Sequence, residues 1–128
     1  MTNTSGTIDN NGATSHIFTA NGTFTFTFRD VTGNTGSVTA TVSNIDTTPP
    51  VISLIGSGSI TVQKDSVYTD SGATWTDNVD GSGTLVASGT VDTSHTGTYT
   101  LTYSKTDTAG NTATTATRAV TVVLDTNT

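Results

Sequence analysis

The stretch NGTFTFTFRDVTGNTGSVTATVSNID, residues 21–46, alternates Thr with large apolar residues around a short polar sequence. Phe24, Phe26 and Phe28 recur at every second position, which places them on one face of a strand with Thr on the other face. The intervening Asp-x-x-Gly-Asn-Thr is rich in turn-forming residues, and its Gly-Asn pair suits a left-handed backbone position. The stretch therefore predicts an antiparallel hairpin with one buried face and one solvent-facing face.

The same pattern occurs again in TGTYTLTYSKTDTAGNTATTATRAVTVVLD, residues 96–125. Tyr99, Leu101 and Tyr103 take the place of the three Phe residues. The second copy is two residues longer before its turn Asp and two longer after it, and we expect the extra residues to form bulges. The recurrence leaves two explanations open: the motif binds something, or it only closes a hairpin in a repeating module.

Composition supports an all-β fold and restricts the classes of function. Thr supplies roughly a quarter of the chain, far above the usual average, and Glu is absent. Thr, Val and Ile favour strands over helices. The net charge is -6 and the pI is about 4.2, so the surface repels nucleic acid and anionic membranes. Without cysteine there is no disulfide, thiolate metal site or cysteine nucleophile.

The first residues, MTNTSGTIDNNG, lack the basic segment and apolar core of a signal peptide. We therefore expect no membrane insertion and no signal in this segment. Met1 is followed by what reads as mid-domain sequence, which predicts that the segment belongs to a longer polypeptide.

The two hairpins are separated by NIDTTPPVI, residues 44–52, whose adjacent prolines stiffen and extend the backbone. We predict the C-terminal strands of a partial repeat in residues 1–47, a linker at 48–50, a complete immunoglobulin-like antiparallel β-sandwich at 51–125, and a tail at 126–128. Strands are expected at 15–19, 23–29, 37–43, 51–55, 59–63, 67–76, 84–91, 98–106 and 116–124.

The residues from Ile45 to Asp125 carry a family resemblance, in DTTPPVISLIG, YTDSGATWTDNVDG, VDTSHTGTYTLTYSKTDTAGNTAT and AVTVV. They resemble the bacterial immunoglobulin-like repeats found in tandem in large surface proteins, and the Ig-like module also present in a pesticidal crystal protein. Residues 13–47 resemble the end of another such repeat type. The resemblance implies an extracellular spacer or stalk module of an adhesin or fibre, not an enzyme, whose partners are neighbouring modules or other copies of itself.

Calcium is the first candidate ligand, because hard cations bind several oxygen atoms and Asp and Asn side chains supply them. In an immunoglobulin-like sandwich the entering linker and two of the loops gather at one end, where a bound ion would stiffen a stalk. The alternative is that these residues only form turns, and DNVDG departs from the EF-hand spacing. The candidate calcium ligands are Asp46, Asp77, Asn78, Asp80, Asp107 and Asn111.

Other candidate sites are weaker. Lys105 stands where the family has a small residue, and strand parity directs it inward, so a Lys–Asn crosslink assisted by a carboxylate is one reading and a strand-end Lys in water is the other. His16 and His95 lie in no nucleophile motif, which argues against hydrolysis. Trp75 is expected in the sandwich core.

Two alternative functions stay open. The partial repeat predicts a self-assembling fibre subunit if strands from another copy complete it. A ligand-binding adhesin module, recognising glycan or protein through its loops, is the other.

Overall fold

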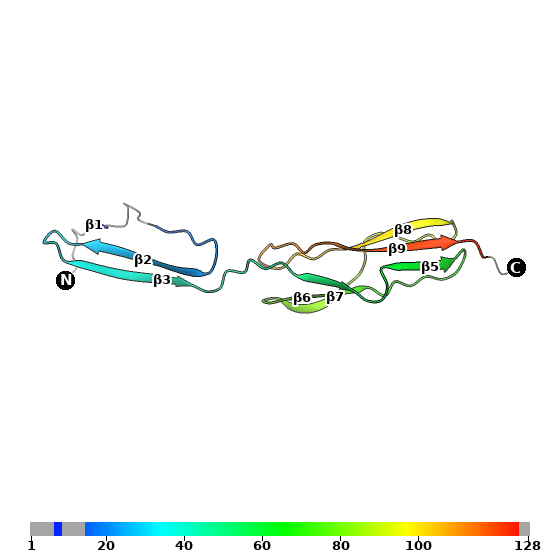
Figure 1. Cartoon of the computed structure of the whole chain (residues 1–128), viewed down its shortest axis with the longest axis horizontal. Coiled ribbons are helices and arrows are strands. Elements are labelled where there is room, and N and C mark those ends of the chain that lie inside the picture. Colours follow the sequence, from blue (N-terminus) through cyan, green and yellow to red (C-terminus); the bar gives the residue numbers. More distant parts are fainter. Residues whose placement is uncertain (1–6, 9–14, 126–128) are drawn as a thin grey trace. The chain divides into compact units, whose positions relative to one another are not determined.

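The computed structural model describes residues 7–8 and 15–125 and contains only strands, turns and irregular segments there. The predicted all-β fold is confirmed for this part of the chain. No helix in it is long and apolar enough to cross a membrane. The chain divides into two compact units, Met1–Thr47 and Thr48–Thr128 (Figure 1). A connecting segment at 43–50 has no regular secondary structure.

The first unit contains one sheet, in the order β1-β2-β3, formed by β1 (Thr7–Ile8), β2 (Gly22–Arg29) and β3 (Thr35–Val42). β2 and β3 pair antiparallel in one unbroken register, with Phe26 opposite Val38 and Thr25 opposite Thr39. The alternation therefore separates an apolar face from a face of Thr and Ser. The hairpin predicted from the sequence is confirmed.

The apolar face of this sheet is only partly covered by the described residues. Phe28 is 43% exposed and Val38 is 60% exposed. The strand predicted at 15–19 is wrong: this segment makes no ladder, because it crosses the apolar face, where the His16 ring stacks on the Phe24 ring with 3.9 Å between centroids. The His16 ring covers Phe24, whereas Ile17 is 83% exposed.

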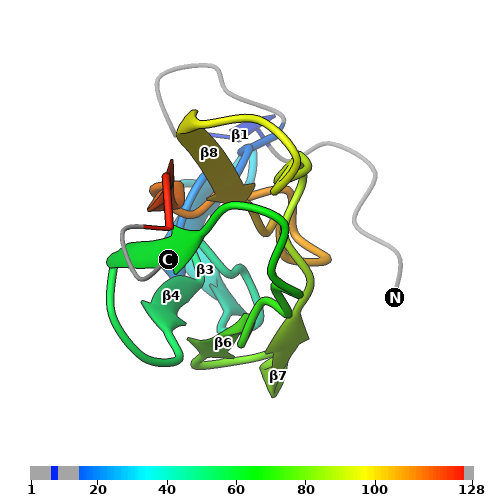
Figure 2. The ribbon, with the colours of Figure 1, turned by 90° about the vertical axis from the view of Figure 1, so that its right-hand side faces the viewer.

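The second unit is a sandwich of two three-stranded sheets, seen end-on in Figure 2. One sheet is antiparallel in the order β4-β6-β7. In the other, in the order β5-β9-β8, β5 runs parallel to β9 and β8 runs antiparallel to it. The predicted immunoglobulin-like β-sandwich is confirmed. The strands are β4 (Val51–Leu54), β5 (Ser59–Gln63), β6 (Ala73–Asp77), β7 (Gly81–Leu85), β8 (Gly97–Tyr103) and β9 (Ala116–Val123).

Alternating side chains from both sheets form the core. Leu101 is 3% exposed and Tyr103 is fully buried, so the inward face predicted for β8 is confirmed. Burying such apolar side chains stabilises a domain by about 1.5–3 kcal/mol each. The buried apolar residues are Ala73, Leu101, Tyr103, Ala113, Val120 and Val122.

Two predicted strands of the second unit are partly wrong. The strand expected at 67–76 begins only at Ala73, because Gly72 has a positive φ of 79° and Asp70 turns its side chain into a polar network. The strand expected at 84–91 ends at Leu85 and begins at Gly81 instead. Beyond it, only Ser88 forms a bridge, to Thr102 of β8.

The extra residues of the second hairpin form the expected bulge-like interruption. The β8–β9 ladder stops at the pair Tyr103–Ala116 and resumes at the bridge Thr106–Thr112. Residues 104–105 on one side therefore lie opposite 113–115 on the other. The interruption leaves the turn itself unchanged.

Candidate functional site

The repeated motif forms the same turn in both units. In the first copy the backbone N–H of Asp30 donates to Asn34 O at 2.9 Å. Asn34 in turn donates its backbone N–H to Asp30 Oδ1 and its Nδ2 to Asp30 Oδ2, both at 2.9 Å. Gly33 sits between them with a φ of 91°, which glycine adopts without steric cost.

The second copy repeats this geometry at Asp107 and Asn111. Asp107 donates its backbone N–H to Asn111 O at 3.0 Å. Asn111 returns its backbone N–H to Asp107 Oδ1 at 2.7 Å and its Nδ2 to Oδ2 at 2.8 Å. Gly110 has a φ of 97°. In both copies the motif closes a hairpin, and its Asp and Asn side chains hydrogen-bond to each other across the turn.

The two Asp residues of the motif differ in burial. Hydrogen bonds from Asn34 and Thr32 lower the pKa of Asp30 to about 2. Burial acts to raise the pKa of Asp107, which is 6% exposed, but hydrogen bonds from Asn111 and from the turn backbone outweigh burial and leave that pKa below its usual value. Asp107 is therefore a buried anion at neutral pH.

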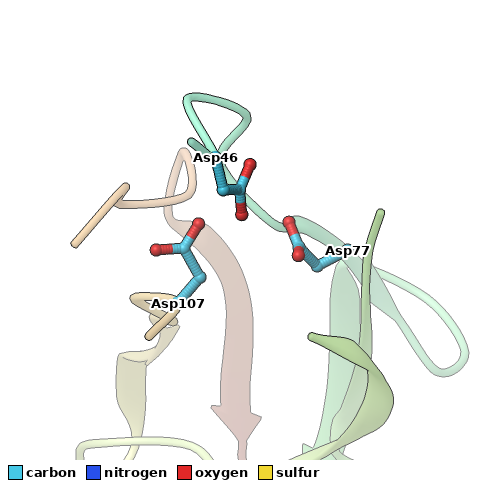
Figure 3. Close-up of side chains that lie close together, drawn as sticks. All are labelled: Asp46, Asp77 and Asp107. Carbon is cyan, nitrogen blue, oxygen red and sulfur yellow. The ribbon is translucent and has the colours of Figure 1, made fainter. Parts of the chain in front are cut away.

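Three carboxylates of the predicted calcium set come together around this anion. Asp46, Asp77 and Asp107 each offer an oxygen atom, and these three atoms lie within 4.8 Å of one another. Figure 3 shows the side chains turned toward one another. Asp107 comes from the turn after β8, Asp77 is the last residue of β6, and Asp46 lies in the connecting segment, two residues before Thr48.

Asp77 has one carboxylate oxygen in a turn and one in the cluster. Its Oδ1 accepts hydrogen bonds from the backbone N–H groups of Val79 at 2.9 Å and Asp80 at 2.8 Å, which closes the β6–β7 turn. Its Oδ2 is buried and has no hydrogen-bond partner among the described residues. Leaving a buried polar atom unsatisfied costs about 1–3 kcal/mol, more for a charged group.

The other predicted ligands have different contacts. Asp80 accepts hydrogen bonds from the Thr108 backbone N–H at 2.8 Å and the Thr108 hydroxyl at 2.6 Å, so it joins the two turns. Asn111 donates its amide to Asp107 and, at 3.5 Å, to Thr48 O. Asn78 is exposed.

Carboxylates this close together repel one another when they are ionised. Two unit negative charges at 4.8 Å repel by about 1 kcal/mol in water and by about 3 kcal/mol at an effective dielectric constant of about 20. Carboxylate oxygens are the ligands that Ca²⁺ prefers. A divalent ion would replace this repulsion with attraction and would give Asp77 Oδ2 a partner.

Lys105 is half-buried, as strand parity predicts, and its ammonium lies over the Trp75 ring, 4.2 Å from the centroid. This is a cation–π contact. Trp75 in turn lies across Gly83 of the neighbouring strand, where an added Cβ would meet the indole Nε1 at 2.7 Å. The indole is half-buried inside the sandwich. The crosslink considered for Lys105 stays a prediction.

His95 belongs to an exposed loop whose geometry differs from that of a catalytic triad. Its Nδ1 lies 2.8 Å from Asp92 Oδ2 and 2.9 Å from the Ser94 hydroxyl. A triad needs the hydroxyl and the carboxylate at opposite ring nitrogens, whereas here both approach the same one.

Arg118 is the principal polar residue that sequence reasoning missed. It is 1% exposed, and its guanidinium donates to the Asp70 carboxylate, to Tyr103 Oη at 2.8 Å, to Ser57 O at 2.9 Å, and to Ile55 O. The sequence ATRAVTVV could have predicted its burial, because alternate residues of a strand face the same side and Arg118 therefore shares a face with Val120 and Val122.

Asp70 balances this buried cation. Burial acts to raise the pKa of Asp70, but hydrogen bonds from Tyr103, Arg118 and Tyr68 outweigh it and lower that pKa below its usual value. Burial and the hydrogen bond to Asp70 raise the pKa of Tyr103 to about 12. The network is therefore an ion pair at neutral pH, and it links β8, β9 and the segments before β5 and β6.

The second unit matches a known protein family. The family described as "Bacterial surface protein, Ig-like domain" matches residues 52–122, more than half of the 128-residue chain. No curated protein matches the chain.

Among solved structures, the lipoprotein BT2262 from Bacteroides thetaiotaomicron is similar, with a TM-score of 0.51 and 23% sequence identity. The similarity covers 62% of this chain and 40% of the lipoprotein, and it supports the sandwich fold. The chain therefore belongs to the bacterial surface protein Ig-like domain family.

Proposed function

We propose that this chain is a spacer module of an adhesin or fibre on the bacterial surface, and that it binds a calcium ion through Asp46, Asp77 and Asp107. The family assignment and the sandwich fold support a structural role at the surface. The observation that carries the calcium proposal is the buried Oδ2 of Asp77, which has no hydrogen-bond partner within the described part of the chain and lies near two further carboxylates.

The donor set fits a hard cation. Ca²⁺ takes six to eight oxygen ligands, and three carboxylates can supply up to about six. Asp107 stays ionised because Asn111 and the turn backbone hold its pKa low, so no proton has to be displaced from it at neutral pH. The bound ion would connect residues from the connecting segment, β6 and the turn after β8, and would thereby stiffen this end of the sandwich.

Thermal unfolding with added calcium or with excess chelator tests this proposal. A ligand at about 100 times its Kd stabilises the native state by about 2.7 kcal/mol, which raises the midpoint of a domain of this size by about 10 °C or more. The sole Trp, Trp75, lies in the second unit and reports its unfolding directly.

Asp77→Asn should abolish the calcium response, because it removes the charge at the unsatisfied oxygen. Asp92→Asn is the matched control, since Asp92 lies in the exposed His95 loop outside the cluster, and it should leave the response unchanged. A midpoint indifferent to calcium, or an equal response in Asp77→Asn, would contradict the proposal.

Self-assembly by strand addition is the second candidate function, and β3 favours it. Among the described strands of its sheet, β3 lies at the edge, and its sequence TGSVTATV has neither charge nor proline. Uncharged, regular edge strands are templates for pairing with another chain. The exposed Phe28 and Val38 lie on the face that a second copy would extend.

Sedimentation at rising protein concentration tests this candidate. Strand addition predicts a mass that grows with concentration, and Val38→Lys should suppress the growth because a charged edge opposes pairing. Val86→Lys is the control, since Val86 is 93% exposed in the second unit. A monomer at every concentration would eliminate this candidate.

A further inference from the structure

Lys105 lies on the same inward face as Asp107, one of the clustered carboxylates. Tyr103, Lys105 and Asp107 are buried or half-buried, whereas Ser104 and Thr106 between them are exposed. Alternate residues of an extended chain face the same side and are about 7 Å apart. Lys105 is therefore the residue one alternation step deeper in the sandwich than Asp107.

Strand β6 brings a second carboxylate of the cluster to the same level. Trp75 and Asp77 are half-buried, and Thr76 between them is exposed, so Trp75 lies one alternation step deeper than Asp77. The Lys105 ammonium lies 4.2 Å from the centroid of the Trp75 ring. The two sheets therefore hold a positive charge one alternation step away from both Asp77 and Asp107.

This charge acts on the carboxylates through space. Among the described residues the Lys105 ammonium contacts the Trp75 ring and has no carboxylate at ion-pair distance. A separation of about 7 Å is shorter than the Debye length of about 8 Å at physiological ionic strength, so salt screens the interaction only in part. A unit positive charge at about 7 Å weakens the binding of a divalent ion roughly tenfold in water, and more at a lower effective dielectric constant.

We propose that Lys105 sets the calcium affinity of the cluster: its positive charge offsets the repulsion between Asp77 and Asp107 in the metal-free protein and opposes the incoming ion. The inference rests on the proposed calcium site and deepens it, because it names the residue that tunes the affinity. A site weakened in this way fills only where calcium is abundant, as in extracellular modules with Kd values of about 10⁻⁴–10⁻³ M.

Isothermal titration of the full chain with calcium chloride tests the inference. Lys105→Met keeps the length of the side chain and removes its charge, so calcium should bind about tenfold more tightly. Lys105→Arg keeps the charge and should leave the Kd within about twofold of the native value.

Lys64→Met is the matched control, because it removes the same charge from the chain. Lys64 pairs with Asp65 directly after β5, at the end of the sandwich away from the turn between β8 and β9 (Figure 1). Its substitution should leave the Kd unchanged. An unchanged Kd in Lys105→Met, or equal tightening in Lys64→Met, would overturn the inference while the calcium site itself stands.

A double-mutant cycle tests the same charge without metal. Urea unfolding in excess chelator compares the native protein with Lys105→Met, Asp77→Asn and the double variant. Attraction between the ammonium and the carboxylate predicts that the double variant loses less stability than the two single variants lose together. Additive losses would overturn the inference whether or not calcium binds.

Two further outcomes are decisive. Coupling in the cycle without any calcium binding by the native protein would refute the proposed calcium site, and with it the competition between Lys105 and the ion. An intact mass lower by one ammonia would also overturn the inference, because a crosslinked Lys105 carries no ammonium.

Discussion

Replacing Arg118 by Met removes the buried cation while keeping a side chain of similar length. The substitution leaves the Asp70 carboxylate, whose side chain is 20% exposed, without its charged partner, and it removes the donors to Ser57 O and Ile55 O. Breaking a buried ion pair in this way costs about 3–5 kcal/mol, a large part of the 5–15 kcal/mol that stabilises a typical domain.

Urea unfolding followed by Trp75 fluorescence measures the loss. With an m-value of about 2 kcal/mol per M, a loss of about 4 kcal/mol lowers the midpoint by about 2 M. Adding Asp70→Asn to the variant should recover part of this loss, because the buried charge is then neutralised as well. Arg29→Met is the matched control in the first unit. If Arg118→Met shifts the midpoint no further than Arg29→Met does, the reasoning about the buried pair is refuted.

Two further predictions concern the interior of the sandwich. Gly83→Ala should destabilise the second unit by about 1–3 kcal/mol and shift the fluorescence of Trp75, since the new Cβ would lie 2.7 Å from the indole nitrogen. Gly58→Ala is the control and should be nearly neutral, because the nearest side-chain atom to its new Cβ is 3.5 Å away. The pKa of Tyr103 rises from 10.0 to about 12 in the fold. The protonated Tyr103 hydroxyl therefore contributes fully to the free energy of unfolding below about pH 10. This contribution, roughly 3 kcal/mol, is lost as the pH rises from about 10 to 12. Stability measured against pH should show a larger alkaline loss in the native protein than in Tyr103→Phe, in which Tyr68, whose pKa is raised as well, still titrates. An identical alkaline slope in both proteins would contradict the prediction.

Local patterns accounted for most of the strands. In β2, β3, β8 and β9, Thr alternates with apolar residues, and a period of two is a property of the extended chain itself. The repeated turn was equally predictable from the sequence, because its Asp, Gly and Asn make contacts within five residues of one another. The strands predicted from the same pattern at 15–19 and 67–72 were wrong. In the first segment His16 stacks on Phe24, and in the second Tyr68 and Asp70 enter a polar network, so neither segment continues a ladder.

The sequence alone thus determined the all-β class, the two related hairpins and a pool of six oxygen-bearing candidate ligands. Only the tertiary structure selected Asp46, Asp77 and Asp107 from that pool, because residues 46, 77 and 107 meet only after two sheets have packed. The same holds for the ion pair of Arg118 with Asp70 and for the parallel pairing of β5 with β9. These contacts join residues far apart in the chain, and no local period or spacing encodes which of them will pair.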